Sequence, residues 1–247
     1  MSKNKKSLKQ TGERLRRLMV AVKDAVFPLY SDITPEEALR IIRESLEDLT
    51  DAQTTQAFLD GFPEIKRLIL TDVEAIAHID PAAADEQEII FCYPAVTAML
   101  HYRTAHLLYT LGVGIIPRML TEHAHSVTGI DIHPATTIGE YFAIDHGTGV
   151  VIGATSRIGN HVTLYQGVTL GAKNFRYGED GLPLKLPRHP ILEDGVTVYS
   201  NASILGRVTI GKGAVIGGNV WLTHSVAPGA RVLQGQIQES FTDGAGI

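Results

Sequence analysis

The hydrophobic residues follow two different periods along the chain, and the change falls near residue 130. Up to about residue 125 they recur at helical spacing. Thr34 can cap free backbone N–H groups, Pro35 fits the first position of a helix, and Glu37 completes a capping box. The sequence Thr-Asp-Val-Glu at residues 71–74 has the form of a second capping box, and Asp80-Pro81 marks a turn between helices. We therefore expect an α-helical domain over residues 1–127.

From about residue 130 the aliphatic residues recur every six positions instead. A glycine often follows the aliphatic residue, and a small or β-branched residue recurs four places further on. A period of six is typical of a parallel β-helix, in which each repeat supplies one short strand and one corner. The pattern predicts an α+β chain with a β-helix over residues 128–232 and a C-terminal tail over residues 233–247. The three series are Ile132, Ile138, Ile144 and Val150; Ile152, Ile158, Leu164 and Leu170; and Leu192, Val198, Ile204, Ile210, Ile216 and Leu222.

Two features interrupt this regular pattern. Residues 172–187 are polar and contain glycine and proline, which predicts a loop that protrudes from one corner of the β-helix. Such a loop is a natural place for function, although a tolerated insertion has the same appearance. Asp145 and His146 stand side by side in a run that is otherwise apolar or glycine. Because the interior of a β-helix has no room for charge, this pair must face outward or lie at a corner.

Acids and histidines gather at three places in the predicted β-helix. A histidine titrates near neutral pH and can take a proton from a hydroxyl that attacks a carbonyl, while a carboxylate orients its ring. Asp131 lies 15 residues before His146, and a coil of three six-residue sides would have about 18 residues, so the two can lie on neighbouring coils within reach. Three histidines also allow a zinc site, but no cysteine joins them, and we expect His133 to be a simple corner residue. The three clusters are Asp131 with His133, Asp145 with His146, and Arg188 with His189.

The composition narrows the possible partners. The net charge of −5 and the pI near 6.0 argue against nucleic acid as the main partner. The sequence has no apolar stretch long enough to predict a membrane span. The single cysteine, Cys92, excludes an internal disulfide and fits a reducing, cytoplasmic compartment. Its apolar neighbours predict a buried filler residue rather than a nucleophile.

Four motifs in the β-helix form a combination that resembles a known family. They are DIHPATTIG from Asp131, IDHGTGVVIG from Ile144, YQGVTLG from Tyr165 and PRHP from Pro187. Together with VEAIAHIDPA upstream and the closing DGAGI, they resemble the serine O-acetyltransferases, the hexapeptide-repeat enzymes of cysteine biosynthesis. The resemblance implies a left-handed β-helix that transfers acetyl from acetyl-CoA to the hydroxyl of L-serine. The attack would be direct, in a ternary complex, with no acyl-enzyme and no metal.

The resemblance also implies a role for each matching residue. His146 would be the base that deprotonates the serine hydroxyl, and Asp131 would be the acid that orients it. His189 would be a second active-site histidine near the substrate hydroxyl. Arg188 would bind the substrate carboxylate, because a guanidinium fork suits two carboxylate oxygens. The residues implied for the substrate ammonium are Asp80 and Asp145, and those implied for acetyl-CoA, in a cleft between subunits, are Gly171, Ser200 and Gly218.

Three kinds of partner follow from the same resemblance. The family forms homotrimers through the β-helix, and in some members two trimers pair through the helical domains. A C-terminal isoleucine after Asp and Gly residues, here Ile247, implies docking into the active site of cysteine synthase. L-Cysteine is implied as a feedback inhibitor, because it differs from L-serine only by sulfur. One departure concerns residues 153–155, Gly-Ala-Thr, where many members have Gly-Glu-Thr, so any role of that glutamate is absent here.

Other functions remain compatible with the sequence. An O-acetyltransferase for a sugar or an antibiotic would use the same fold and a histidine base, but an amino-acid substrate better explains Arg188, Asp80 and Asp145. A zinc enzyme like the β-helical carbonic anhydrases is a second alternative. A third is a catalytically idle binding subunit that works only through its tail. The complete set of acids, histidines and arginine speaks against this last alternative.

Overall fold

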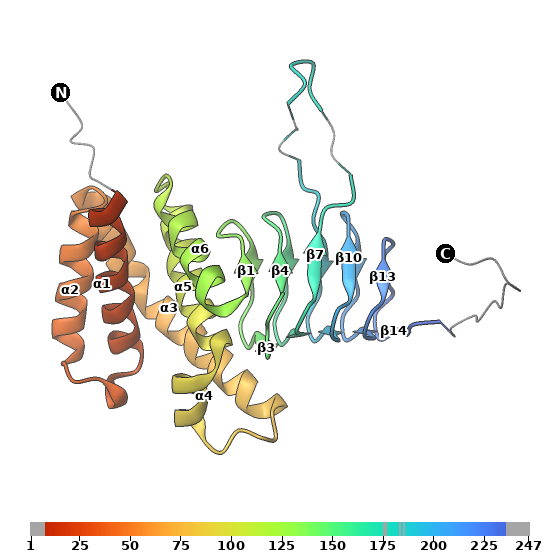
Figure 1. The fold of residues 1–247 in the computed structure, drawn as a ribbon, viewed down its shortest axis with the longest axis horizontal. Coiled ribbons are helices and arrows are strands. Elements are labelled where there is room, and N and C mark those ends of the chain that lie inside the picture. The colour runs from red at the N-terminus through yellow and green to blue at the C-terminus, as the bar shows by residue number, and fades with distance from the viewer. Residues whose placement is uncertain (1–7, 175–176, 183, 185, 236–247) are drawn as a thin grey trace, which may run out of the picture.

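The computed structural model describes residues 8–174, 177–182, 184 and 186–235 of the 247-residue chain. Helices occupy one end of the elongated molecule, short strands stack along the other, and a long loop projects sideways from the stack (Figure 1). This arrangement confirms the predicted order of a helical region followed by a parallel β-helix.

The helical region contains six α-helices and one short 3-10 helix among the described residues. The Thr34 hydroxyl accepts a hydrogen bond from the Glu37 backbone N–H at 3.2 Å, which confirms the predicted helix start. The second predicted capping box is wrong, because residues 71–74 lie inside one continuous helix of 28 residues. The elements are α1 (Leu8–Val26), η1 (Pro28–Tyr30), α2 (Pro35–Glu47), α3 (Ala52–Ile79), α4 (Glu86–Cys92), α5 (Pro94–Thr110) and α6 (Ile116–Thr128).

In the part of the chain that the structure describes, fourteen short strands form three parallel sheets, which are the three sides of the β-helix. The first sheet consists of β1 (Asp131–Ile132), β4 (Val151–Ile152), β7 (Thr169–Gly171), β10 (Ser203–Leu205) and β13 (Trp221–Leu222). The second consists of β2 (Thr137–Ile138), β5 (Arg157–Ile158), β8 (Ile191–Leu192) and β11 (Thr209–Ile210). The third consists of β3 (Ala143–Asp145), β6 (Thr163–Tyr165), β9 (Thr197–Val198), β12 (Val215–Ile216) and β14 (Arg231–Val232).

The pairing register explains both interruptions of the six-residue period. Ile152 pairs with Leu170 in the next coil, 18 residues later, as three six-residue sides require. Leu170 pairs with Ile204 across 34 residues, and the additional 16 match the predicted loop at 172–187. In the first coil, Ile132 pairs with Ile152 across 20 residues. The prediction that Val150 continues the series of Ile132, Ile138 and Ile144 is therefore wrong. Val150 is buried, but it lies two places before Ile152, the residue that pairs with Ile132.

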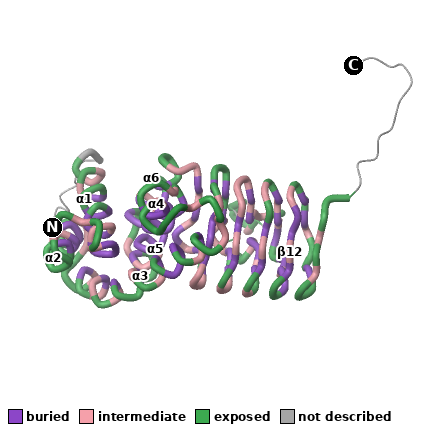
Figure 2. Tube along the Cα trace, turned by 90° about the horizontal axis from the view of Figure 1, so that it is seen from below, coloured by how far each residue is buried: buried purple, intermediate pink, exposed green. Residues whose placement is uncertain are grey.

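The aliphatic residues of the repeats form one continuous core inside the coils. Most strands bury their aliphatic residue and leave its neighbours more exposed, as the alternating colours of the coils in Figure 2 show. Ile152, Leu164, Leu170 and Ile204 are at most 1% exposed. Because each coil covers the next, the burial of these columns supplies the main stabilisation of the β-helix.

Side chains of α3 and α5 attach the helical region to the first coil. Arg103 and Asp72 form a buried ion pair at 2.8 Å, and both side chains are at most 3% exposed. The Arg103 guanidinium also donates to the carbonyls of Ile138 and Gly139, while Asp72 accepts from the backbone N–H of Phe142. Burial raises the pKa of Asp72 to about 6, although the charge of Arg103 opposes this rise. Through these contacts the pair holds the helix that leads to Asp80 against the β-helix.

Two further observations concern the composition. Cys92 is exposed at the end of α4, so the expectation of a buried filler residue is wrong. In the described part of the chain, the helices are too short or too polar to span a bilayer.

Candidate functional site

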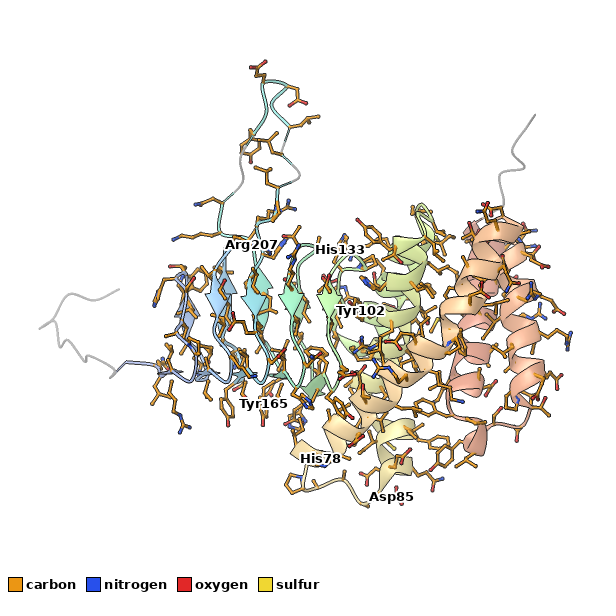
Figure 3. The ribbon with its side chains drawn as sticks, turned by 180° about the vertical axis from the view of Figure 1, so that it is seen from behind. His78, Asp85, Tyr102, His133, Tyr165 and Arg207 are labelled. Carbon is orange, nitrogen blue, oxygen red and sulfur yellow. The ribbon has the colours of Figure 1, made fainter. Side chains whose placement is uncertain are left out.

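The predicted functional residues lie mainly along two of the three edges of the β-helix. We define the His146 edge as the turns from the third sheet to the first, at residues 145–150, 165–168, 199–202 and 217–220. We define the loop edge as the turns from the first sheet to the second, at residues 133–136, 153–156, 172–190 and 206–208. The two edges border opposite sides of the first sheet. Figure 3 shows Arg207 and His133 on the side of the protruding loop and Tyr165 on the other side.

His146 lies in a turn that is two residues longer than its equivalents in the later coils. The backbone N–H of Gly167 donates to the carbonyl of Thr148, so Thr148 and Gly149 match Gln166 and Gly167 of the next coil. The additional residues are therefore His146 and Gly147. Both have positive φ, 54° and 89°, and a Cβ on Gly147 would approach Ile130 to 2.5 Å. The insertion pushes the imidazole out of the turn, and its side chain is 73% exposed.

Two carboxylates accompany His146 on this edge. Asp145 approaches the His146 Nε2 to 3.8 Å. Asp80 caps the C-terminus of α3, and one of its oxygens accepts from the Ala82 backbone N–H at 2.8 Å while the other accepts from the Tyr93 hydroxyl. These two hydrogen bonds, with the charge of nearby His146, hold the pKa of Asp80 below its ordinary value. In return, Asp80 raises the pKa of Tyr93 to about 12.

His189 lies on the loop edge in a setting that differs strongly from that of His146. Its ring rests against Gly153, where an added Cβ would come within 2.1 Å of the ring. Its Nδ1 accepts from the backbone N–H of Thr155 at 3.1 Å and lies 2.8 Å from the Thr155 hydroxyl. Arg207 fixes the backbone around it by donating to the carbonyls of Thr155 and His189. His189 as a whole is only 7% exposed.

The charge state of His189 follows from this setting. Desolvation, followed by the positive charges of Arg188, His133 and Arg207, lowers the pKa of His189 to about 4. Desolvation likewise lowers the pKa of His133. At neutral pH His189 is therefore an uncharged imidazole.

A cavity of about 400 Å³ lies at the base of the protruding loop. Lys173, Arg188 and Arg207 give it a positive lining, and Leu205 with Gly206 adds apolar surface and exposed backbone. Gly171 adjoins the cavity, because its carbonyl accepts from the Gly206 backbone N–H at 2.9 Å. This combination suits a ligand that carries phosphate groups on an apolar arm.

Of the remaining predicted residues, two lie on the His146 edge, and Asp131 lies in β1 of the first sheet. Ser200 and Gly218 are neighbours on the His146 edge, where a Cβ on Gly218 would lie 3.2 Å from the Ser200 carbonyl oxygen. Asp131 pairs in register with Val151, which follows His146 by five residues, so Asp131 and His146 lie at adjacent levels of the stack. The Asp131 carboxylate, however, faces Arg118 at 3.5 Å. In the described residues of one chain, no hydrogen bond or ion pair joins Asp131 to His146.

The structure offers a possible metal site, but with other residues than the three histidines of the predicted zinc site. Among the described residues, the group that could bring three ligand atoms together is Glu122, His125 and Asp131, all within 4.8 Å of one another. Arg118 forms ion pairs with both of its acids. The group contains none of the three histidines of the zinc alternative, and a cation would have to displace the guanidinium.

Sequence reasoning missed four residues that position the predicted ones. Tyr93 donates to Asp80, Thr155 contacts His189, Arg207 donates to the carbonyls of His189 and Thr155, and Arg118 faces Asp131. Thr155 was visible only as part of the Gly-Ala-Thr departure at residues 153–155. The other three partners are 13 to 18 residues away in sequence, and no motif connects them.

The fold and the repeats define the class of the protein. Residues 189–224 match the family model of the bacterial transferase hexapeptide with six repeats. The chain is 50% identical over 216 residues to the plasmid serine acetyltransferase of Synechococcus elongatus. The aligned region covers 87% of this chain and 66% of the relative. It is 41% identical over 162 residues to the serine acetyltransferase of Mycobacterium tuberculosis. That alignment covers 66% of this chain and 67% of the relative. The chain thus spans about two thirds of the length of these relatives.

Solved structures agree with these relatives. The fold matches serine acetyltransferase isoform 3 of Entamoeba histolytica, in complex with cysteine, with a TM-score of 0.78 and 35% identity over 92% of this chain and 84% of that one. It matches the serine acetyltransferase of Neisseria gonorrhoeae, in complex with serine, with a TM-score of 0.67 and 30% identity over 94% and 88%. The Brucella abortus enzyme, in complex with coenzyme A, gives a TM-score of 0.67 and 25% identity over 94% and 82%. The chain belongs to the serine acetyltransferase family of hexapeptide-repeat acyltransferases, which confirms the resemblance.

Proposed function

We propose that the protein is a serine O-acetyltransferase that transfers acetyl from acetyl-CoA to the hydroxyl of L-serine. The observation that carries this proposal is the two-residue insertion that presents His146 beside Asp80 and Asp145. An exposed imidazole can take the hydroxyl proton, while two carboxylates attract the ammonium of an amino acid. A sugar acceptor has no ammonium and leaves the two carboxylates without a role.

The proposed reaction is a direct transfer. His146 takes the proton of the serine hydroxyl while that oxygen bonds to the thioester carbonyl carbon. The tetrahedral intermediate collapses, the carbon–sulfur bond breaks, and the imidazolium returns the proton to the leaving thiolate. The products are O-acetylserine and coenzyme A, and the reaction is the first step of cysteine biosynthesis. Cys92 lies outside both edges, in accord with a reaction that has no acyl-enzyme.

We propose that each active site combines the His146 edge of one subunit with the loop edge of a neighbour. The two edges border opposite sides of one sheet, so a single chain keeps its own His146 away from its own Arg188 and His189. In a homotrimer the loop edge of each subunit can face the His146 edge of the next. Asp131 and Arg188 would then meet His146 across the interface, and the acetyl-CoA would lie between Gly171 on one side and Ser200 and Gly218 on the other.

Mixed trimers test this shared site. His146→Ala and His189→Ala variants, each impaired alone, should give more activity when co-expressed than the mean of the two separate variants, because about a quarter of the sites would combine two intact edges. Acetyl transfer to L-serine, measured by thiol release, would give the result. Mixtures that do not exceed this mean, in trimers shown to contain both chains, would contradict the shared site. Activity with galactosides and none with L-serine would instead favour the sugar acetyltransferase.

Further partners follow from the proposed function. L-Cysteine should compete with L-serine, because the same carboxylate and ammonium contacts accept both. Pairing of two trimers through the helical regions would give a hexamer, and the protein would work in the cytoplasm. The predicted docking into cysteine synthase rests on Ile247, which lies outside the described residues. Removal of Ile247 should abolish binding to cysteine synthase without changing acetyl transfer, and unchanged binding would contradict the docking.

A further inference from the structure

The Thr155 hydroxyl makes an unusually complete set of hydrogen bonds around His189. Its oxygen accepts from the backbone N–H of Arg188 at 2.9 Å and from the backbone N–H of His189 at 3.1 Å. Two accepted hydrogen bonds occupy both lone pairs of a hydroxyl oxygen, so its own proton remains as a donor. The partner at 2.8 Å is the His189 Nδ1, and the hydroxyl proton therefore points to that ring nitrogen.

A second donor reaches the same nitrogen. The Thr155 backbone N–H lies 3.1 Å from the His189 Nδ1, and an amide N–H can only donate. With two donors directed at Nδ1, this nitrogen has no place for a proton of its own. In a neutral imidazole the single N–H is then on Nε2.

The Nε2 atom is the part of His189 that remains available to a ligand. No hydrogen bond from a described residue reaches Nε2. The atom is also not fully buried, so part of its surface stays open. The Cδ2–Nε2 side of the ring lies next to Gly153, which has no side chain to cover it, and Arg207 holds the backbone carbonyl of His189 at 2.9 Å. The neighbouring charged and titratable groups are Arg188, Arg207 and His133, which disfavour a second proton on the ring.

We propose that Thr155 is a positioning residue that fixes His189 as a neutral Nε2–H donor, so that His189 serves the reaction by donating a hydrogen bond to a substrate oxygen and not as a base. The proposal deepens the proposed function, on which its kinetic part rests. It divides the work between the two histidines: His146 moves the proton, and His189 stabilises the negative charge that grows on an oxygen of the reacting centre. A donor fixed in advance is effective in that role because it needs no reorganisation during the reaction.

The tautomer can be measured without any substrate. In the folded protein labelled with ¹⁵N at histidine, the two ring nitrogens of His189 are distinguished by NMR and assigned with the His189→Gln variant. We expect a protonated Nε2 and an unprotonated Nδ1 from about pH 5 to about pH 8, with no titration in this range. A proton on Nδ1, or a titration between these limits, would overturn the proposal whether or not the protein acetylates serine.

Substitution of Thr155 tests the positioning role. Thr155→Val keeps the shape and removes the hydroxyl, and we expect kcat/KM to fall about ten- to hundredfold, with a signal that shows mixed tautomers of His189. Thr155→Ser retains the hydroxyl and should stay within about threefold of the natural protein. Equal losses in the two variants would refute the role of the hydroxyl. If Thr155→Val does not fold, the tautomer measured in the natural protein still decides the matter.

Substitution of His189 tests the donor role itself. Glutamine carries an N–H₂ group near the position of Nε2 but cannot act as a base at neutral pH. We expect His189→Gln to retain at least about tenfold more activity than His189→Ala, because one hydrogen-bond donor is worth about that factor. Equal activity of the two variants would show that His189 does not act through a donated hydrogen bond.

Discussion

His146 and His189 are held by the fold in opposite ways. His146 stands on a two-residue insertion, its side chain is 73% exposed, and its Nε2 lies 3.8 Å from the Asp145 carboxylate. His189 is 7% exposed, its ring lies against Gly153, and Thr155 occupies its Nδ1. The first is open to contact with a ligand, while the second is enclosed by its neighbours. Two residues of the same type can therefore serve one reaction in different roles, set by the turn that carries each.

Removal of the His146 imidazole should have the largest effect. His146→Ala is expected to lower kcat by about 10² to 10⁴, the usual contribution of a positioned base, without changing the fold. His161→Ala is a matched control, because His161 is also exposed and its φ of 55° is close to the 54° of His146. Steady-state thiol release measures both variants. An equal loss in the two would show that the strained turns matter and the base does not.

The fixed state of His189 predicts a pH dependence of stability. Its pKa of about 4 in the folded protein lies below the value of about 6.5 in the unfolded chain, so the unfolded chain binds the proton first as the pH falls. The contribution of neutral His189 to the free energy of unfolding is complete above pH 6.5 and is lost toward pH 4. From this residue alone, the free energy of unfolding should decrease by about 2 to 3 kcal/mol between pH 7 and pH 4.5. Urea unfolding at both pH values measures this, and His189→Gln should reduce the decrease. An identical pH dependence in the variant would contradict the assignment.

Gly153→Ala tests whether the position of the His189 ring matters for activity. The new methyl group would overlap the His189 ring and displace it, while His146 on the opposite edge is unaffected. We expect kcat/KM to fall about tenfold or more, with the His146-dependent pH profile of activity unchanged. Gly114→Ala is the control, because a Cβ at Gly114 meets nothing within 4 Å. Full activity of Gly153→Ala would mean that the position of the His189 ring is unimportant.

Tyr93→Phe should have the smallest effect. It removes the hydroxyl that donates to Asp80, so the carboxylate loses one of its two fixed contacts. The expected result is a rise of about three- to tenfold in the KM for L-serine with little change in kcat, since Asp80 is assigned to binding. Tyr30→Phe, on an exposed aromatic residue of the helical region, is the control. A fall in kcat at constant KM would contradict a binding role.

The repeats could be predicted because each one reports the same local geometry. Ile152, Leu164 and Leu170 recur at a fixed spacing, and the structure places all three in the core. The counting failed at Val150, because both Val150 and Ile152 are buried and a period alone does not show where two residues were inserted. His146 and Gly147 became recognisable as the insertion only when hydrogen bonds matched Thr148 with Gln166.

The rest depended on contacts between distant parts of the chain. Thr71 and Asp72 are residue types that often cap helices, yet both lie inside α3. Their side chains instead accept hydrogen bonds from the backbone N–H groups of Tyr141 and Phe142, respectively. Polar side chains serve equally well as caps and as tertiary contacts, so local pattern does not separate the two uses. The same holds for Thr155 and Tyr93, whose importance lies in the residue each one holds.

The end of the β-helix nearest the helices has a consequence for assembly. Strand N–H groups in this stack donate to carbonyls of the next coil, as Asp131 does to Val150, and corner N–H groups donate back, as Gly149 does to Gly129. The first coil has no coil before it to donate to its strand carbonyls. Side chains of α5 take that place: Tyr102 donates to Thr136, and Arg103 donates to Ile138 and Gly139. A stray strand or a second molecule therefore finds no open template there, and end-to-end growth into filaments is blocked at this terminus.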